Sequence, residues 1–154
     1  LEHALTIHPD HTALIIGSGS ESVSRDIDRI APHMSKRIKA IGFMEHDQVL
    51  KTYGESRVFL LSSRSESFNI AAAEAVCMGC SLAAPPHIPT ATWFSSHDSG
   101  TVSSIYSAGS LADALSIELE SWNNLSRDPL KISSHWRQIL GSESCAKSLS
   151  RLSK

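Results

Sequence analysis

Short apolar runs alternate with longer amphipathic segments along most of the chain. The apolar runs are uninterrupted and only a few residues long, which is typical of strands buried in a parallel sheet. In residues 110–122, by contrast, Leu111, Leu115 and Leu119 recur at four-residue spacing and share one face of a helix. This alternation predicts an α/β fold with a Rossmann-like, doubly wound parallel sheet flanked by helices.

Turn and cap residues set the expected boundaries of these elements. After a helix tail at residues 1–5, strands are expected at 12–17, 37–42, 58–61, 81–84 and 101–105, and helices at 21–33, 45–54, 69–78 and 110–122. Beyond residue 124 the sequence is richer in serine, and a terminal helix is expected from near Pro129. We therefore expect residues 1–154 to form a single domain, with residues 125–154 as a C-terminal helical tail.

The polar turn between strand 58–61 and helix 69–78 is the most informative segment. It carries Glu66, and Glu74 follows eight residues later in the second turn of the helix. Such turns lie at the carboxyl ends of parallel strands, where ligands bind, and the free amides of residues 68–71 would favour a phosphate. Helical side chains lean toward the N-terminus, so Glu74 is expected near the same edge as Glu66. A ligand with both phosphate and hydroxyl groups, such as a nucleotide sugar, fits this arrangement.

This segment resembles the signature of the group 1 (family 4 type) retaining glycosyltransferases, a Glu-x-Phe-Gly turn followed by a Glu-Ala helix. Here it reads Glu66-Ser67-Phe68-Asn69, then Glu74-Ala75, then Gly79. The similarity continues in order through residues 5–120. It implies the C-terminal, nucleotide-sugar-binding half of a GT-B fold. The family's first strand and its cationic phosphate loop would precede Leu1, so the resemblance implies a fragment of a larger glycosyltransferase.

The resemblance also implies roles for the matched residues. Glu66 would contact the donor sugar near the reacting carbon and is the candidate catalytic residue, and Glu74 would accept hydrogen bonds from the ribose hydroxyls. The candidate donor-binding residues are Glu74, Ser67, Phe68, Asn69, Ile70, Gly17, Gly19, Phe43 and Met44. The alternatives are an exposed helix glutamate at 74, a polar turn residue at 66, a plain tight turn at 17–19 and a core phenylalanine at 43.

Three positions depart from the family pattern. Asn69 replaces a glycine, Ser62 a proline, and Pro86-His87 a pair of glycines. Asparagine tolerates the left-handed backbone region, so we expect the first change to be mild structurally, although it can alter phosphate contact. Arg64 is the only cation within the turn. It is either a partial substitute for the absent phosphate ligands or a plain exposed arginine.

The implied function is donor binding by an enzyme that transfers a sugar (hexosyltransferase type) from a nucleoside diphosphate to an acceptor, with retention, in glycan biosynthesis. The acceptor, a glycan, lipid or small molecule, would bind through the missing N-terminal domain, and the fragment alone would be inactive. No metal or other cofactor is expected. A GT-B-fold epimerase or phosphorylase and a non-catalytic nucleotide-sugar-binding module stay open as alternatives.

Composition and charge limit the partners and the cellular location that we expect for this chain. The net charge of −2 gives no electrostatic reason to expect nucleic acid. No apolar run approaches the roughly 20 residues of a membrane span, and no secretory signal is recognised. Cys77 and Cys80 are expected to be buried, reduced thiols rather than a metal or redox pair. These features favour a cytoplasmic location, and peripheral association with a membrane surface through another segment stays open.

Overall fold

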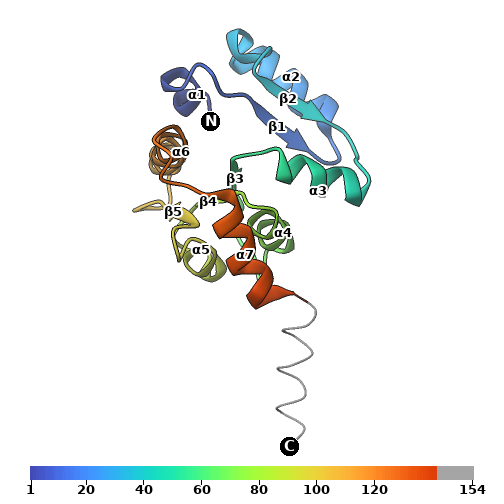
Figure 1. Ribbon diagram of the computed structural model, residues 1–154. Helices are drawn as coiled ribbons and strands as arrows, with labels where there is room; N and C mark the ends of the chain where they lie inside the picture. The colour runs from blue at the N-terminus through green and yellow to red at the C-terminus, as the bar shows by residue number, and fades with distance from the viewer. Residues whose placement is uncertain (142–154) are drawn as a thin grey trace, which may run out of the picture. The chain divides into compact units, whose positions relative to one another are not determined.

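Helices and parallel strands alternate through residues 1–141, the part of the chain that the computed structural model describes (Figure 1). The chain divides into two compact units, residues 1–49 and residues from 50 onward. Each unit contains parallel strands with flanking helices, so the predicted α/β class is confirmed. The prediction of one domain over 1–154 stays a prediction, and residues 142–154 of the expected tail lie outside the described residues.

The first unit is built on one parallel strand pair. Its elements are α1 (Glu2–Ile7), β1 (Ala13–Ile16), α2 (Ser20–Ile30), a 3₁₀ turn (Pro32–Met34) and β2 (Ile38–Ile41). A small core gathers Leu5, Ala31, Met34 and Ile38. The expected helix 21–33 was wrong at its end: α2 stops at Ile30 because Pro32 cannot donate an amide and restricts the residue before it.

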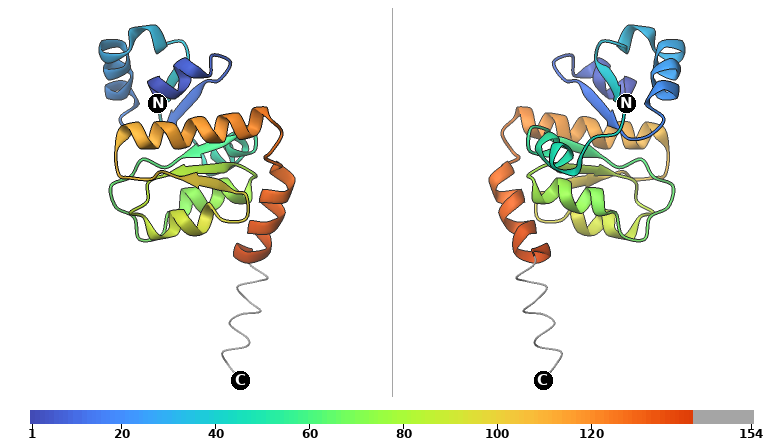
Figure 2. Two further views of the ribbon diagram at one scale, coloured as in Figure 1. Left: turned by 90° about the vertical axis from the view of Figure 1, so that its left-hand side faces the viewer. Right: turned by 90° about the vertical axis from the view of Figure 1, so that its right-hand side faces the viewer.

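The second unit has three layers. Its elements are the end of α3 (His46–Gly54), β3 (Val58–Leu60), α4 (Ile70–Cys77), β4 (Ser81–Ala84), α5 (Pro89–Phe94), β5 (Gly100–Val102), α6 (Ala108–Asn123) and α7 (Pro129–Leu140). The parallel strands follow the order β3-β4-β5. Figure 2 shows α6 along one face of this sheet and α4 with α5 along the other, and α7 packs against α4.

The core of the second unit lies between β4 and the helices. Every residue of β4 is buried, and Trp136 of α7 is fully buried in the same core. The Trp136 ring meets those of Phe94 and Trp93 edge-on at centroid distances of 5.3 Å, and its Nε1–H donates to Ser99 Oγ at 2.8 Å. The terminal helix predicted from Pro129 is therefore confirmed, with Asp128 as its N-cap.

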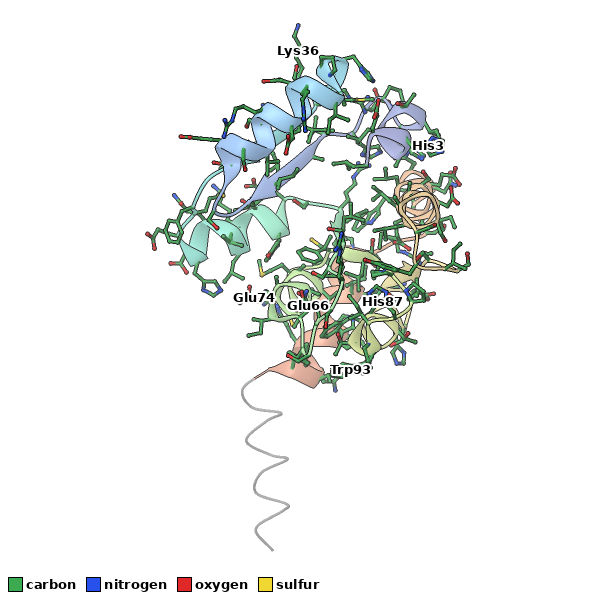
Figure 3. All side chains as sticks on the ribbon, turned by 180° about the vertical axis from the view of Figure 1, so that it is seen from behind. His3, Lys36, Glu66, Glu74, His87 and Trp93 are labelled. Atoms are coloured by element: carbon green, nitrogen blue, oxygen red, sulfur yellow. The ribbon has the colours of Figure 1, made fainter. Side chains whose placement is uncertain are left out.

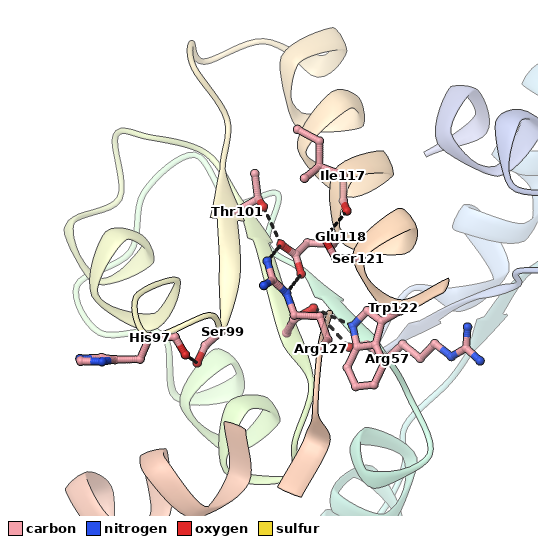
Figure 4. Close-up of polar contacts among 10 residues, drawn as sticks. Arg57, His97, Ser99, Thr101, Ile117, Glu118, Ser121, Trp122 and Arg127 are labelled. Atoms are coloured by element: carbon pink, nitrogen blue, oxygen red, sulfur yellow. Dashed lines mark hydrogen bonds and ion pairs between the residues drawn. The ribbon is translucent and has the colours of Figure 1, made fainter. Parts of the chain in front are cut away.

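One buried ion pair connects α6 to the segment before α7 (Figure 4). The carboxylate of Glu118 is fully buried and accepts two hydrogen bonds from Arg127, at 2.9 and 2.7 Å. It also accepts a 2.5 Å hydrogen bond from Thr101 Oγ1 of β5. This carboxylate therefore ties α6, β5 and the α6–α7 connection together.

The sequence predicted that strand 58–61 would be buried on both faces, and this was wrong. Val58, Phe59 and Leu60 are all partly exposed. β3 pairs with β4 along one edge, and no strand among residues 1–141 pairs with its other edge. β1 likewise pairs along one edge only among residues 1–141, and its Leu14 and Ile15 are 45% and 38% exposed.

Helix α5 was missed, because residues 88–90 were expected to form only a turn. Pro89 occupies its first turn, where the fixed φ of proline suits a helix and its missing amide costs nothing. Six residues are too few to show a helical period in the sequence. The expected strand 101–105 is also shorter, since β5 ends at Val102 and Ile105 is exposed.

Candidate functional site

The turn between β3 and α4 carries Glu66 at the carboxyl end of the sheet (Figure 3). Ser63 Oγ donates a 2.7 Å hydrogen bond to Glu66 Oε1. This bond fixes the orientation of the carboxylate from within the turn. Phe68 lies further along the turn, with its ring 5.7 Å from that of Phe94 and 6.5 Å from that of Trp93.

Asn69 is the N-cap of α4, whereas Ser67 lies outside the helix. Asn69 Oδ1 accepts from the Ala72 amide at 2.7 Å, and the first helical backbone bond runs from Ala73 N–H to Asn69 O. The amides of Ile70 and Ala71 precede this bond, so they have no partner within the helix. Asn69 has φ −77°, so this position does not require the left-handed conformation that would favour the family's glycine.

Replacing this cap provides a local test of α4. We expect Asn69→Ala to lower the free energy of unfolding by about 1 kcal/mol, since an orphan helical amide loses its acceptor, and Asn69→Gly by only a few tenths. Urea unfolding of both variants measures the difference. Equal stability of Asn69→Ala and the unaltered chain would contradict the assignment of the cap.

Glu74 lies on the second turn of α4, partly buried, beside an open cavity of about 300 Å³. The cavity is lined by Glu74 and by the largely apolar side chains of Leu50, Ile70, Ala73, Cys77, Met78 and Leu140. Burial, and secondarily the charge of Glu74, raises the pKa of Tyr53. Burial also raises the pKa of Cys77, with Arg137 opposing and Glu74 adding to the effect. A carboxylate therefore faces a mainly apolar hollow.

The other candidate residues lie in the first unit, at the carboxyl ends of β1 and β2. Gly17 and Gly19 have φ of +142° and +83°, and Gly19 is the N-cap of α2, so this turn needs glycine. Phe43 is 82% exposed, so its interpretation as a core residue was wrong, while Met44 is partly buried. The structure thus groups residues 17, 19, 43 and 44 in one unit and residues 66–74 in the other.

The cysteines of α4 and its C-terminal end are free thiols, but only Cys80 is buried as expected, because Cys77 is partly exposed. Burial raises the pKa of Cys80 to about 12, and its Sγ–H donates to Tyr53 O at 3.1 Å. This thiol therefore stays protonated near neutral pH, as expected for a buried structural cysteine. Within residues 1–141, no group of three or more His, Cys, Asp or Glu side chains is arranged to hold a metal ion. No helix in that range is both long and apolar enough to cross a bilayer.

Sequence reasoning missed the side chains that support the turn from neighbouring loops. His87 Nε2 lies 2.8 Å from the carbonyl oxygen of Arg64, and the His87 ring packs edge-on against Tyr106 at 4.1 Å. Arg64 itself has an exposed side chain. The only signal in the sequence was the departure at Pro86-His87, where the family has two glycines.

The fold is that of GT-B glycosyltransferases. The chain superposes on the pneumococcal O-GlcNAc transferase GtfA, solved in complex with UDP and GlcNAc, with a TM-score of 0.71 at 23% identity. It also superposes on sucrose-phosphate synthase from Thermosynechococcus elongatus, with a TM-score of 0.66 at 14% identity. The matches cover 98% and 99% of this chain but only 31% and 48% of those two proteins.

The chain belongs to the family described as glycosyl transferases group 1, whose sequence model matches residues 2–131. This match confirms the resemblance found at Glu66–Gly79 and places the chain among glycosyltransferases. No curated protein sequence matches the chain.

Proposed function

We propose that this chain binds the nucleoside-diphosphate-sugar donor of a retaining glycosyltransferase, as the C-terminal half of its GT-B fold. The observation that carries the proposal is the pairing, on one short helix, of open N-terminal amides with a partly buried carboxylate that lines a cavity. The amides of Ile70 and Ala71 suit a diphosphate, because a helix N-terminus carries partial positive charge. Glu74 suits the two ribose hydroxyls, since a carboxylate accepts two hydrogen bonds in a fixed fork.

The proposed chemistry is electrostatic. When the sugar leaves the nucleoside diphosphate, negative charge grows on the departing phosphate, and fixed amides aimed at that charge lower the barrier. Glu66, oriented by Ser63, would accept hydrogen bonds from the donor sugar near the reacting carbon. The N-capping geometry of Asn69 supports an intact helix start rather than a degraded one. In this proposal the acceptor binds to another part of the protein, and residues 1–154 alone do not transfer sugar.

The UDP and GlcNAc of the GtfA complex support a nucleotide-sugar ligand and make UDP the first probe. We propose no resident metal or cofactor. In the first unit, Phe43, whose ring is exposed, stays a sequence-based candidate for stacking on a nucleobase, and Met44, Gly17 and Gly19 stay sequence-based candidates for donor contact.

The decisive experiment is a calorimetric titration of the 154-residue chain with UDP, GDP and ADP and their sugar conjugates, repeated with Glu74→Gln. We expect one nucleotide to bind selectively and Glu74→Gln to weaken it by about tenfold, the usual cost of losing a charged hydrogen-bond acceptor. Glu120→Gln, an exposed glutamate on α6, is the matched control and should bind as the unaltered chain does.

Two results would count against this proposal. If Glu74→Gln binds as tightly as Glu120→Gln, the ribose role of Glu74 is wrong. If no nucleotide binds either to the chain or to the full-length protein, the donor-site assignment fails as a whole.

A further inference from the structure

The turn that carries Glu66 is held by a histidine from the next strand's loop. His87 follows β4, and its Nε2 lies 2.8 Å from the carbonyl oxygen of Arg64, two residues before Glu66. A carbonyl oxygen only accepts hydrogen bonds, so Nε2 is the donor. Both the Nε2–H tautomer of neutral histidine and the imidazolium ion can make this bond.

A third loop restrains the imidazole ring itself. Tyr106, which follows β5, meets the His87 ring at a centroid distance of 4.1 Å and an interplanar angle of 61°. Aromatic pairs favour such edge-on contacts. The loops after β3, β4 and β5 are therefore connected in series, through Arg64, His87 and Tyr106.

The Arg64 carbonyl lies between the two ends of the Ser63–Glu66 hydrogen bond along the chain. That internal bond, at 2.7 Å, orients the Glu66 carboxylate relative to its own turn, but it does not fix the turn to the sheet. His87 lies outside the turn, and its hydrogen bond fixes the backbone of the turn between Ser63 and Glu66. Reacting groups need placement within about 0.5 Å, which an exposed polar turn does not provide by itself.

We propose that His87 is a positioning residue for Glu66: its Nε2–H holds the Arg64 carbonyl and thereby keeps the turn in its donor-binding conformation. This proposal rests on the proposed function, because it assigns a purpose to the placement of Glu66. His87 acts through the backbone of the turn and is not itself assigned a contact with the donor.

The test compares His87→Ala with His87→Gln in the 154-residue chain. The side chain of glutamine carries an amide N–H at a similar distance from the backbone, so it can donate the same hydrogen bond without an imidazole ring. His3→Ala, an exposed histidine on α1, is the matched control. Two quantities are measured: the affinity for the nucleotide sugar by calorimetry, and the backbone mobility of residues 63–66 by ¹⁵N relaxation, which needs no ligand.

We expect His87→Ala to weaken donor binding about fivefold, the usual worth of one hydrogen bond, and to increase the mobility of residues 63–66. His87→Gln should return both quantities to within about twofold of the unaltered chain, as should His3→Ala. Unchanged mobility in His87→Ala would overturn the proposal, and so would a His87→Gln variant as impaired as His87→Ala.

The two proposals fail separately. If the unaltered chain binds donor, and Glu74→Gln weakens that binding while His87→Ala does not, only the role of His87 is overturned. If His87→Ala loosens the turn but no donor binds, His87 still anchors the turn and the donor-site assignment is what fails.

Discussion

Arg127→Ala is expected to lower the free energy of unfolding of the second unit by about 3–5 kcal/mol, because it leaves the buried carboxylate of Glu118 without its counter-ion. Glu118 is 0% exposed and Arg127 makes two of its hydrogen bonds. The hydrogen bond with Glu118 is also the main reason that the pKa of Arg127 is raised. Thr101 alone provides one neutral hydrogen bond, which does not replace the lost charge.

Urea unfolding followed by tryptophan fluorescence measures this loss. Trp93, Trp122 and Trp136 all lie in the second unit, so the signal reports that unit. Lys51→Ala is the control, because its 3.9 Å pair with Glu55 is exposed and should contribute less than about 0.5 kcal/mol.

A double variant with Arg127→Met and Glu118→Met separates lost charge from lost packing. Apolar residues of similar volume often replace a buried ion pair at little cost, so we expect most of the stability to return. A single Arg127→Ala variant that loses no more than Lys51→Ala would refute the role assigned to this ion pair.

Trp136→Ala is expected to cost about 3–5 kcal/mol, the range for removing a large buried aromatic side chain. Trp136 is fully buried, and its ring is in contact with Phe94 and Trp93 on α5. Its removal leaves a cavity between α7 and α5 and also leaves the buried hydroxyl of Ser99 without its donor. Circular dichroism during urea unfolding measures this change without depending on the fluorescence of the altered residue.

Trp136→Phe is the matched control for this prediction. Phenylalanine keeps most of the ring packing but loses the hydrogen bond to Ser99 and part of the volume, so we expect a smaller loss of about 1–2 kcal/mol. Similar losses for the two variants would show that the hydrogen bond, and not the packing of α7, accounts for the stability.

The sequence predicted those parts of the fold that depend on local patterns. β4 was predicted with its observed bounds, and the start of α4 was predicted within one residue, because a short, mainly apolar strand and an asparagine cap both have local signals. Exposure of β3 was not predictable in this way, since it depends on which strands lie beside it. Apolar composition alone does not reveal an unpaired edge.

The candidate site likewise contains residues that a local motif identifies and contacts that only the folded chain brings together. Glu66, Asn69 and Glu74 belong to one continuous segment, so a motif was sufficient to select them, and their roles toward a donor stay predictions until binding is measured. His87 contacts a residue 23 positions earlier in the chain, and Arg127 reaches Glu118 across the end of a helix. Such contacts form because the fold brings distant segments together, and the spacing of residues along the sequence does not predict them.

Among residues 1–141, no strand pairs with the outer edge of β3, and this has a practical consequence for work with the chain. Arg57 and Leu61 bond toward β4, so the backbone groups of Val58 and Leu60 point to the other side, as alternate residues do in a parallel ladder. An edge of this kind is a template for any extended polypeptide, including a misfolded copy of the same chain. The titrations and unfolding experiments should therefore be done at low protein concentration. A peptide that adds a strand to this edge should reduce aggregation.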